Sequence, residues 1–472
     1  MTLHFTLSSR RDAASQVYRQ MRDAILDGRL HADDALPPTR RLAAELGLSR
    51  TTVTVVYERL RAEGFVVSRV GAGTFVRPGI RQRSESESRE TLSALTPRAL
   101  WETLPEGLDM SGPAPRFDFR TGLPDARQFP YAAWRRRMAT QLQQITVGTG
   151  AHIDAAGLPA LRAAIARHLR TSRGLTVAAD DVLVTSGSQQ AIDLVTRVLL
   201  EPRQVVAMED PGYQPARRAF LAHGCTVRGV PVDAAGLVVD ALPARARLVY
   251  VTPSHQYPLG IPMSMERRQA LLSWAAAHHA AVVEDDYDSE FRFGGRPLEP
   301  LRSLDTCGRV LYVGSFSKSM LPTLRLGFVV APSTLHAALR KAKHATDWHS
   351  PVPTQAALAQ FLEDGVLAQH LRRLRRAFTK RHDTMRELLT GKFRGVLTPI
   401  AAPGGLHLAA TFDDPAVDDC GVAQRAHERG VAMFPLSPRY VDTPPRSGLL
   451  LGYGGIEPED IAEGLRRLSE CI

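Results

Sequence analysis

The chain has 472 residues, of which 44% are hydrophobic and 23% are charged. These values are ordinary for globular proteins, exclude a fibrous or mainly disordered chain, and leave room for two or three domains. The formal net charge of +10 favours a polyanionic partner. No apolar run is long enough to span a membrane, and the N-terminus lacks a signal-peptide core. Because the four cysteines lack CxxC or metal-ligand spacing, we expect a reduced, cytoplasmic protein.

The first 78 residues have the pattern of a winged helix-turn-helix. Apolar residues at helical spacing predict helices over residues 12–27, 39–46 and 50–63, and a glycine follows each of them. Two short β-like runs, 65–68 and 74–76, are joined through a glycine-containing turn and predict a hairpin. This order of elements is typical of a DNA-binding head.

The third predicted helix begins with side chains that suit a DNA major groove. Ser49 is a good N-cap, and the hydroxyl and guanidinium groups that follow it can contact base edges and phosphates. Residues 1–80 hold 12 arginines and no lysine against 8 acidic residues. The resulting net charge of +4 is too small to indicate DNA binding, so the order of elements carries that prediction. A helix-turn-helix used only for protein contacts is the alternative.

This segment resembles the GntR-type winged-helix DNA-binding domain over nearly its full length. The matching stretches are IxxGRL from Ile25, LPPTRxLA from Leu36, LSRTTVxxxYERLxAEG from Leu48 and GAGTFV from Gly71. The resemblance implies DNA contacts by the arginine of the LPxxR motif, by the start of the recognition helix and by the glycine of the wing. The residues at these positions and their neighbours are Arg40, Ser49, Arg50, Thr51, Thr52, Thr54 and Gly71.

A polar linker separates the head from a large α/β domain. We place the head at residues 1–78, a flexible linker at 79–116 and the large domain at 117–472. Residues 79–90 are charged and low in apolar side chains, which is typical of a tether. In the large domain, short apolar runs alternate with helix-length segments, which predicts βαβ units and a mostly parallel sheet covered by helices. Ligands bind such sheets at the carboxyl ends of the strands.

Four apolar runs of the large domain end in polar signatures, so we expect these signatures to converge on one site. The first run ends in Gly187, Ser188 and Gln189, directly before a predicted helix. Backbone N–H groups at such a turn can bind an anion, although a plain helix cap has the same pattern. The second run ends at Tyr213, which could stack on a cofactor ring or simply anchor a loop.

The third and fourth runs end in side chains that could contact the polar atoms of a ring. His255 follows the third run, and residues 284–288 at the end of the fourth include four acidic residues. Asp285 and Tyr287 share one face of the strand, so one could pair with a pyridinium N–H and the other with a ring oxygen. The alternatives are a metal site and a solvated edge. Since a transition metal favours histidine or spaced ligands, we expect no metal site here.

A lysine lies between two apolar runs, 310–313 and 324–330, that predict buried strands. The chain has five lysines against 54 arginines; four of the lysines have polar, helix-like surroundings, and only Lys318 lies among serines and strands. Desolvation lowers a lysine pKa, and a neutral amine forms Schiff bases with aldehydes. Ser315, Ser317 and Arg325 would suit a phosphate, so the stretch indicates pyridoxal phosphate. Taken alone, it fits equally a lysine whose stem runs along a strand end.

The large domain resembles the fold-type I aminotransferases, and the fused chain resembles the MocR/GabR-type regulators. The matching stretches are TSGSQQAIDL, EDPGY, VTPSHQYPLG, EDDYDSEFRF and GSFSKSMLPTLRLG. The resemblance implies that Lys318 forms the internal aldimine with pyridoxal 5'-phosphate, with Asp285 at the pyridine nitrogen and Tyr287 at the ring oxygen. His255 stands where many aminotransferases have asparagine. Around the phosphate and the ring, the resemblance implies Gly187, Ser188, Gln189, Ser315, Ser317, Arg325 and Tyr213.

Two positions depart from the family pattern. His152 stands where the family usually has a tyrosine that reaches the phosphate of the partner subunit. Leu450 stands where relatives that bind an amino-acid effector have an arginine for its carboxylate. Arg439 is the substitute candidate for that carboxylate, and an arginine of a surface loop is the other interpretation. These departures favour an effector without an α-carboxylate, or the cofactor itself.

The sequence therefore predicts a pyridoxal phosphate-dependent transcriptional regulator. A small amine or amino acid, or the cofactor, bound at Lys318 would change the geometry of a homodimer and so its binding to a double-stranded DNA operator. Family analogy implies a head-to-tail dimer. One alternative is an active aminotransferase with a vestigial head, which the leucine at position 450 disfavours. A DNA-binding repressor without cofactor is the other.

Overall fold

The structure is a computed structural model that describes residues 5–7, 12–80, 96–106, 115–147, 152–293 and 298–472. Its internal contacts divide the chain into two compact units, Met1–Pro97 and Arg98–Ile472. The predicted tether at residues 79–90 lies, except for its first two residues, outside the described residues. Among the described helices, none has the length and apolar character that crossing a bilayer requires.

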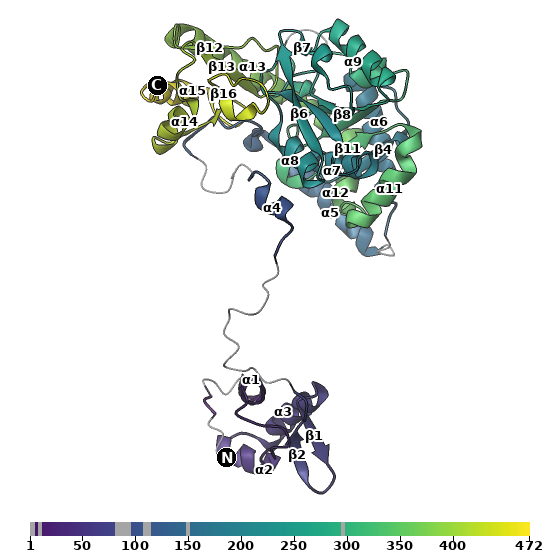
Figure 1. Cartoon of the computed structure of the whole chain (residues 1–472), viewed down its shortest axis with the longest axis vertical. Helices are drawn as coiled ribbons and strands as arrows, with labels where there is room; N and C mark the ends of the chain where they lie inside the picture. The colour runs from purple at the N-terminus through teal and green to yellow at the C-terminus, as the bar shows by residue number, and fades with distance from the viewer. Residues whose placement is uncertain (1–4, 8–11, 81–95, 107–114, 148–151, 294–297) are drawn as a thin grey trace. The chain divides into compact units, whose positions relative to one another are not determined.

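The smaller unit is a winged helix-turn-helix (Figure 1). Ser49 begins the third helix as predicted, because its Oγ accepts a hydrogen bond from the Thr52 N–H at 3.0 Å. Gly47 ends the second helix in the left-handed conformation, with φ +62°. The elements lie within a few residues of the predicted bounds: α1 (Ala13–Leu26), α2 (Thr39–Leu46), α3 (Arg50–Ala62), β1 (Val66–Arg69) and β2 (Gly73–Val76).

An eight-stranded sheet forms the centre of the larger unit. Its order is β4-β11-β10-β9-β8-β5-β6-β7, and β10, β9, β8, β5 and β6 are parallel. The strand β11 is antiparallel to both of its neighbours. The strands are β4 (Val182–Thr185), β5 (Val205–Asp210), β6 (Thr226–Asp233), β7 (Gly236–Leu237), β8 (Ala246–Val251), β9 (Ala281–Asp286), β10 (Val310–Ser315) and β11 (Gly327–Val330).

The strand after Lys318 begins later than the apolar pattern predicts. Residues Pro322–Leu324 form a 3-10 turn, and Arg325 adopts the left-handed conformation with φ +50°. The ladder with β10 therefore starts at Gly327 rather than at Leu324. The prediction of a mostly parallel sheet covered by helices is otherwise confirmed.

Helices cover both faces of the sheet, because strand residues alternate between two buried cores. One face, with Val206, Leu248 and Val283, packs against α7 (Ser188–Leu199), α8 (Gln214–Ala222) and α11 (Ser333–Asp347). Part of the other face, with Val205, Val249 and Val282, packs against α9 (Met265–Ala277) and α10 (Leu301–Leu304). The remaining core on that side includes residues of α5 (Tyr131–Val147), α6 (Pro159–Arg173), α12 (Val352–Glu363) and α13 (Val366–Lys392).

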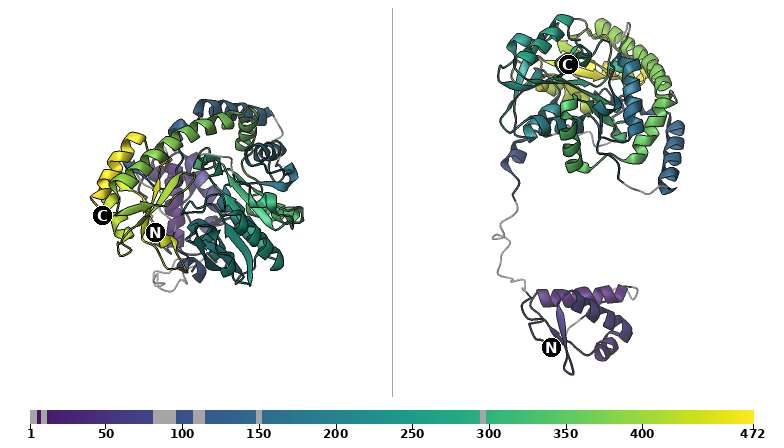
Figure 2. Two further views of the ribbon diagram at one scale, coloured as in Figure 1. Left: turned by 90° about the horizontal axis from the view of Figure 1, so that it is seen from above. Right: turned by 90° about the vertical axis from the view of Figure 1, so that its right-hand side faces the viewer.

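A smaller four-stranded sheet, in the order β12-β13-β16-β15, forms the C-terminal part of this unit. Helix α13 contacts both α12 and this part, and Figure 2 shows its light-green ribbon running alongside the yellow C-terminal elements. The strand β3 (Phe117–Asp118) pairs with β14, so the start of the unit lies against its end. The other elements are α4 (Ala99–Thr103), β12 (Leu397–Pro399), β13 (His407–Phe412), α14 (Asp419–Glu428), β14 (Val431–Ala432), β15 (Phe434–Pro435), β16 (Gly448–Gly452) and α15 (Pro458–Ser469).

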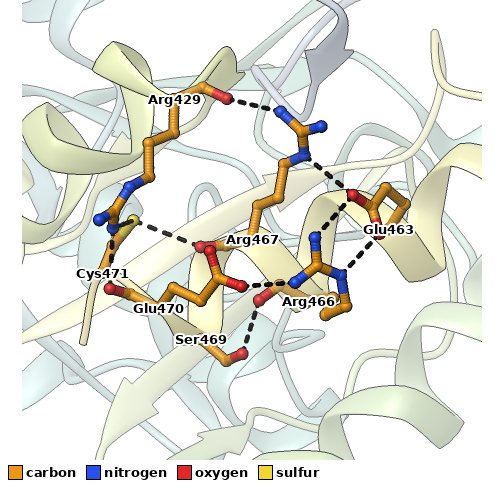
Figure 3. Close-up of polar contacts among 7 residues, drawn as sticks. All are labelled: Arg429, Glu463, Arg466, Arg467, Ser469, Glu470 and Cys471. Atoms are coloured by element: carbon orange, nitrogen blue, oxygen red, sulfur yellow. Dashed lines mark hydrogen bonds and ion pairs between the residues drawn. The ribbon is translucent and has the colours of Figure 1, made fainter.

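Hydrogen bonds join the last helix, α15, and the residue that follows it to Arg429, directly after α14, and ion pairs within α15 orient its arginines (Figure 3). The Glu463 carboxylate pairs with Arg466 at 2.7 Å and with Arg467 at 3.0 Å. Arg467 also donates to the carbonyl of Arg429 at 3.3 Å, and Arg429 donates to the carbonyl of Glu470 at 2.8 Å. These groups are half-buried or exposed, so we assign them a role in orienting the C-terminal helix rather than a large share of stability.

Candidate functional site

A cavity of about 420 Å³ lies at the carboxyl ends of β5, β8, β9 and β10. This is the edge at which the sequence places its polar signatures. Gly187 and His255 lie next to the wall of the cavity rather than in it. The predicted residues that line the cavity are Ser188, Gln189, Tyr213, Asp285, Tyr287, Ser315, Ser317, Lys318, Arg325 and Arg439.

Lys318 lies in the turn that follows β10, and its amine faces the cavity. The Nζ atom donates to the carbonyl oxygen of Gly122 at 2.6 Å. A Cβ at Gly122, where φ is +85°, would lie 2.8 Å from this nitrogen, so glycine permits the close approach. Burial lowers the pKa of Lys318, and the carboxylates of Asp288 and Asp285 only partly oppose this shift. The lower pKa makes the neutral, nucleophilic form of the amine less costly to reach.

Asp285 presents an unsatisfied carboxylate oxygen at the end of β9. Its Oδ2 accepts from the Tyr250 hydroxyl at 2.6 Å, whereas its buried Oδ1 has no hydrogen-bond partner among the described residues. Burial raises the pKa of Asp285 to about 7, against the opposing hydrogen bond from Tyr250. A buried acceptor without a donor is costly, so a ligand with an N–H group would stabilise this site.

The Tyr287 hydroxyl is held in place from behind the cavity wall. It donates to the backbone carbonyl of His255 at 3.0 Å and lies 2.9 Å from the Nδ1 of the same residue. His255 is buried and pairs with Asp288, whose carboxylate lies 3.0 Å from Nδ1. In this structure His255 therefore acts on the cavity by orienting Tyr287.

Small polar groups and one guanidinium surround the N-terminus of α7. The Ser315 Oγ lies 3.0 Å from the Ser317 Oγ and accepts from the Ser317 N–H at 3.1 Å. The Arg325 Nη2 donates to the carbonyl of Ser186 at 2.8 Å. Gly187 has φ +84°, and a Cβ there would lie 2.8 Å from Nη2, so this turn requires glycine. Hydroxyls, a guanidinium and the free N–H groups of a helix start together suit a phosphate.

Arg439 reaches the cavity from the C-terminal part of the unit. Its Nε is buried without a hydrogen-bond partner among the described residues, and its guanidinium lies 5.2 Å from the centre of the Phe434 ring. Asp210, at the end of β5, holds the segment that follows. Its carboxylate accepts hydrogen bonds of 2.7 to 2.9 Å from Val441, Asp442 and Thr443.

Several cavity residues are absent from the sequence-based prediction. Tyr250 and Tyr257 belong to a stretch that the prediction used. Because alternate residues of a strand point to the same face, the pattern of β8 could have indicated Tyr250. Tyr257 packs edge-on against Tyr213 with ring centres 5.4 Å apart. Other cavity residues, for which no local pattern indicates this position, include Thr121, Gly122, Arg218 and His407.

Neither of the two positions that depart from the family pattern lines the cavity. His152 is exposed and contacts His349 at 3.3 Å and the Trp348 ring at 4.4 Å between ring centres. Leu450 is buried in β16, in a small apolar cluster with Ala409. Lys343 has the polar, helix-like surroundings that the sequence predicts, since it lies on α11 and bonds to Gln190, Asp347 and Ser350, but its side chain is fully buried.

The predicted DNA-contacting residues lie on the surface of the head or close to it. Arg40, Ser49, Arg50 and Thr51 are exposed, and Thr52 is half-buried. The half-buried Thr54 donates its hydroxyl to the carbonyl of its helix neighbour one turn earlier, at 2.9 Å. A Cβ at Gly71, where φ is +76°, would meet nothing within 4 Å, so the turn conformation alone favours glycine there.

Comparison with known proteins shows what this combination of units is. The model of aminotransferase class I and II matches residues 122–468, and that of the bacterial regulatory proteins of the gntR family matches residues 13–76. The chain is 37% identical over 461 residues to the probable rhizopine catabolism regulatory protein MocR of Rhizobium meliloti, covering 97% of this chain and 93% of that protein. The chain belongs to the MocR-type regulators.

Two further relatives agree with this assignment. The MocR-type chain is 32% identical to the HTH-type pyridoxine biosynthesis transcriptional regulator PdxR of Corynebacterium glutamicum, over 97% of this chain and 95% of PdxR. Its large unit resembles the solved structure of LysN, an α-aminoadipate aminotransferase of Thermus thermophilus, complexed with N-(5'-phosphopyridoxyl)-L-leucine. The TM-score is 0.68 at 30% identity, covering 75% of this chain and 91% of LysN. The protein is a pyridoxal phosphate-dependent transcription regulator whose head binds DNA.

The cavity of this MocR-type regulator fits pyridoxal phosphate on its own features. The Asp285 Oδ1 lacks a donor, which a pyridinium N–H would supply. The close approach of Gly187 and Arg325 leaves no room for a Cβ, and this turn at the start of α7 would suit an anion. Lys318 supplies a primary amine in the same cavity. The residues present therefore match the ring, the phosphate and the aldehyde of the cofactor.

We expect the affinity of this MocR-type regulator for pyridoxal phosphate to fall below pH 7. The folded pKa of Asp285, about 7, lies above its unfolded value, so the neutral carboxyl is favoured as the pH falls through that value. A neutral carboxyl attracts a pyridinium N–H less, and the dissociation constant should rise by up to about tenfold per pH unit. Spectroscopic titrations from pH 6 to 8 measure this, with Asp285→Asn as the control. An equal pH dependence in that variant would refute the assignment to Asp285.

Proposed function

We propose that an amine or amino-acid effector, or pyridoxal phosphate itself, binds in the cavity at Lys318 and thereby modulates operator binding by the head. The observation that carries this proposal is that two residues with unsatisfied polar atoms line the same cavity. The Asp285 Oδ1 at one wall and the Arg439 Nε at another are both buried without a partner among the described residues. The first suits the cofactor ring, and the guanidinium of Arg439, which lines the same cavity, suits an acidic effector group.

Each residue that the sequence predicts for the cofactor has a role in this proposal. Lys318 would hold the cofactor covalently, Asp285 would accept from its ring N–H, and Tyr287 would contact its ring oxygen. Bound pyridoxal phosphate supplies an aldehyde carbon that reacts with primary amines. Tyr213 would cover the ring, with His255 orienting Tyr287. The phosphate would lie among Gly187, Ser188, Gln189, Ser315, Ser317 and Arg325.

Arg439 would bind the acidic group of an effector. Its guanidinium is supported by the Phe434 ring and lines the cavity, whereas Leu450 is buried in the strand β16. A carboxylate accepts hydrogen bonds from a guanidinium readily, which would give the unpartnered Nε an acceptor. An amine without an acidic group would not use this residue.

On the DNA side, the exposed start of α3 would enter a major groove. Arg40, Ser49, Arg50, Thr51, Thr52 and Thr54 would contact bases and phosphates there, with Gly71 in the wing. A homodimer, with its large units paired head-to-tail by family analogy, would present two heads to two half-sites. A ligand that changed the geometry of the dimer would change how both heads fit the operator.

Two reciprocal variants test this function in one experiment. Fluorescence anisotropy would follow binding to an operator selected from random duplex DNA with the wild-type protein, with and without pyridoxal phosphate and a panel of amines and amino acids. We expect Arg50→Ala to weaken operator binding by about 10- to 100-fold, equivalent to ~1–3 kcal/mol, and to leave the ligand-induced spectral change intact. We expect Arg439→Gln to keep operator binding and to lose the response to acidic effectors.

The outcomes separate the parts of the proposal. If wild-type protein selects no DNA sequence, the regulatory function is wrong. If operator binding is the same with every ligand and with the cofactor removed, the cavity does not control the head. Sustained turnover of an amino donor and a keto acid would instead favour the aminotransferase alternative.

A further inference from the structure

A second lysine of the large unit is buried without lining the cavity. Lys343, on α11, is fully buried. Its Nζ donates to the Gln190 Oε1 at 2.7 Å, to the Asp347 carboxylate at 2.8 Å and to the Ser350 Oγ at 3.2 Å. An ammonium group is costly to bury unless its donors are paired, and here all three have an acceptor. The acceptors, rather than the surrounding apolar core, therefore account for the position of this lysine.

Gln190 connects this lysine to the backbone of the turn at the start of α7. The Gln190 Oε1, which accepts from Lys343, also accepts from the Ser186 N–H at 2.8 Å. Its Nε2 donates to the Asp347 Oδ2 at 2.8 Å. Because both ends of the amide are bound, its oxygen is fixed towards Ser186. The position of Lys343 thus determines where the Ser186 N–H is held.

Ser186 in turn sets the two groups that face an anion. Its carbonyl accepts from the Arg325 Nη2 at 2.8 Å, so the same residue that Gln190 holds also holds this guanidinium. Gly187 follows, with no space for a Cβ beside Arg325, and α7 begins at Ser188. A shift of Ser186 would therefore move both the guanidinium and the helix N-terminus.

We propose that Lys343 is a positioning residue for the phosphate group of pyridoxal phosphate. It acts through Gln190 and Ser186, and it holds the Arg325 guanidinium and the start of α7 in the arrangement that binds the phosphate. The inference rests on the phosphate location in the proposed function. Removal of residues that orient metal ligands changes metal affinity by about 10- to 100-fold, and we expect an effect at the lower end of that range for this phosphate.

The test compares two ligands that differ only in the phosphate. Dissociation constants of the cofactor-free protein for pyridoxal phosphate and for pyridoxal would be measured by absorbance titration. We expect Lys343→Met to raise the dissociation constant for pyridoxal phosphate by about tenfold and to change that for pyridoxal by less than about twofold. Lys341→Met, at an exposed position two residues earlier on α11, is the matched control and should change neither constant. The proposal would be overturned if Lys343→Met weakened the binding of both ligands equally, or if it weakened the binding of neither.

Two more variants make the result decisive. Gln190→Met should reproduce the phosphate-specific loss, and it carries the test if Lys343→Met does not fold. The variant with both substitutions, at Lys343 and Gln190, should lose no more affinity for pyridoxal phosphate than the single variant with the larger loss. This is expected because both residues act through one chain of contacts. Arg325→Met reports on the phosphate location itself. If this variant leaves pyridoxal phosphate binding unchanged, the proposed site is wrong; if it weakens binding while Lys343→Met does not, only the positioning role fails.

Discussion

Replacing Lys318 by alanine should give a folded protein that cannot hold pyridoxal phosphate covalently. The side chain is the primary amine beside Asp285 in the cavity, and burial lowers the pKa of this amine. Without it, we expect the visible absorption of the cofactor linkage to disappear and borohydride to fix no cofactor to the chain. We expect the affinity to fall by at least about 100-fold, equivalent to ~2.7 kcal/mol, and the ligand-dependent operator response to be lost.

The control for this variant is Lys341→Ala, which removes an exposed lysine from α11. It should keep the absorption, the borohydride-fixed adduct and the response of operator binding to ligand. Mass spectrometry of the reduced wild-type protein should locate the adduct on residue 318. An adduct on another lysine, or a normal operator response in Lys318→Ala, would contradict the assignment.

Replacing Arg381 by methionine should destabilise the large unit more than any surface substitution. Arg381 on α13 is 2% exposed and donates to the Asp125 Oδ2 at 2.6 Å and to the carbonyl of Gly454 at 2.7 Å. Burial alone would raise the pKa of Asp125, but hydrogen bonds from Arg381, Gln128 and Arg127 outweigh it and lower that pKa. Removing one partner of a buried ion pair costs ~3–5 kcal/mol, so the free energy of unfolding should fall by about that amount.

Arg127→Met provides the matched control, because Arg127 pairs with the same Asp125 carboxylate at 3.1 Å but its side chain is 55% exposed. We expect this variant to lose less than about 1 kcal/mol. Urea unfolding of the large unit at pH 7 compares the two. Since the folded pKa of Asp125 lies below its unfolded value, this stabilisation is present above the unfolded pKa and is lost as the pH falls through the folded one. Equal losses in the two variants would refute the role of burial.

Local signals in the sequence were sufficient for the head. Ser49 begins α3 through a side-chain hydrogen bond, and Gly47 ends α2 in the left-handed conformation. Both effects involve only neighbouring residues, so α2 lies where the pattern predicts it. The convergence of the cavity residues was also predictable, because parallel strands end at the same edge of a sheet.

Contacts between distant segments explain what the sequence did not reveal. Asp210 binds residues that lie more than 230 positions later, and this pairing places Arg439 at the cavity. Lys343 has ordinary helical neighbours in sequence, and only the approach of α7 to α11 makes its burial apparent. The late start of β11 follows from the left-handed Arg325, a conformation that residue type alone does not indicate for arginine.

The anchoring of the C-terminal segment by Asp210 also bears on how this regulator discriminates between ligands. A rotation of that segment away from β5 would leave a carboxylate that is 2% exposed without its donors, which is costly. The spacing between the Lys318 amine and the Arg439 guanidinium is therefore preset before a ligand arrives. Under the proposed function, a molecule that reacts at one end and is bound as an anion at the other would have to match that span, so chain length, more than the identity of the acidic group, would decide which compounds the regulator senses.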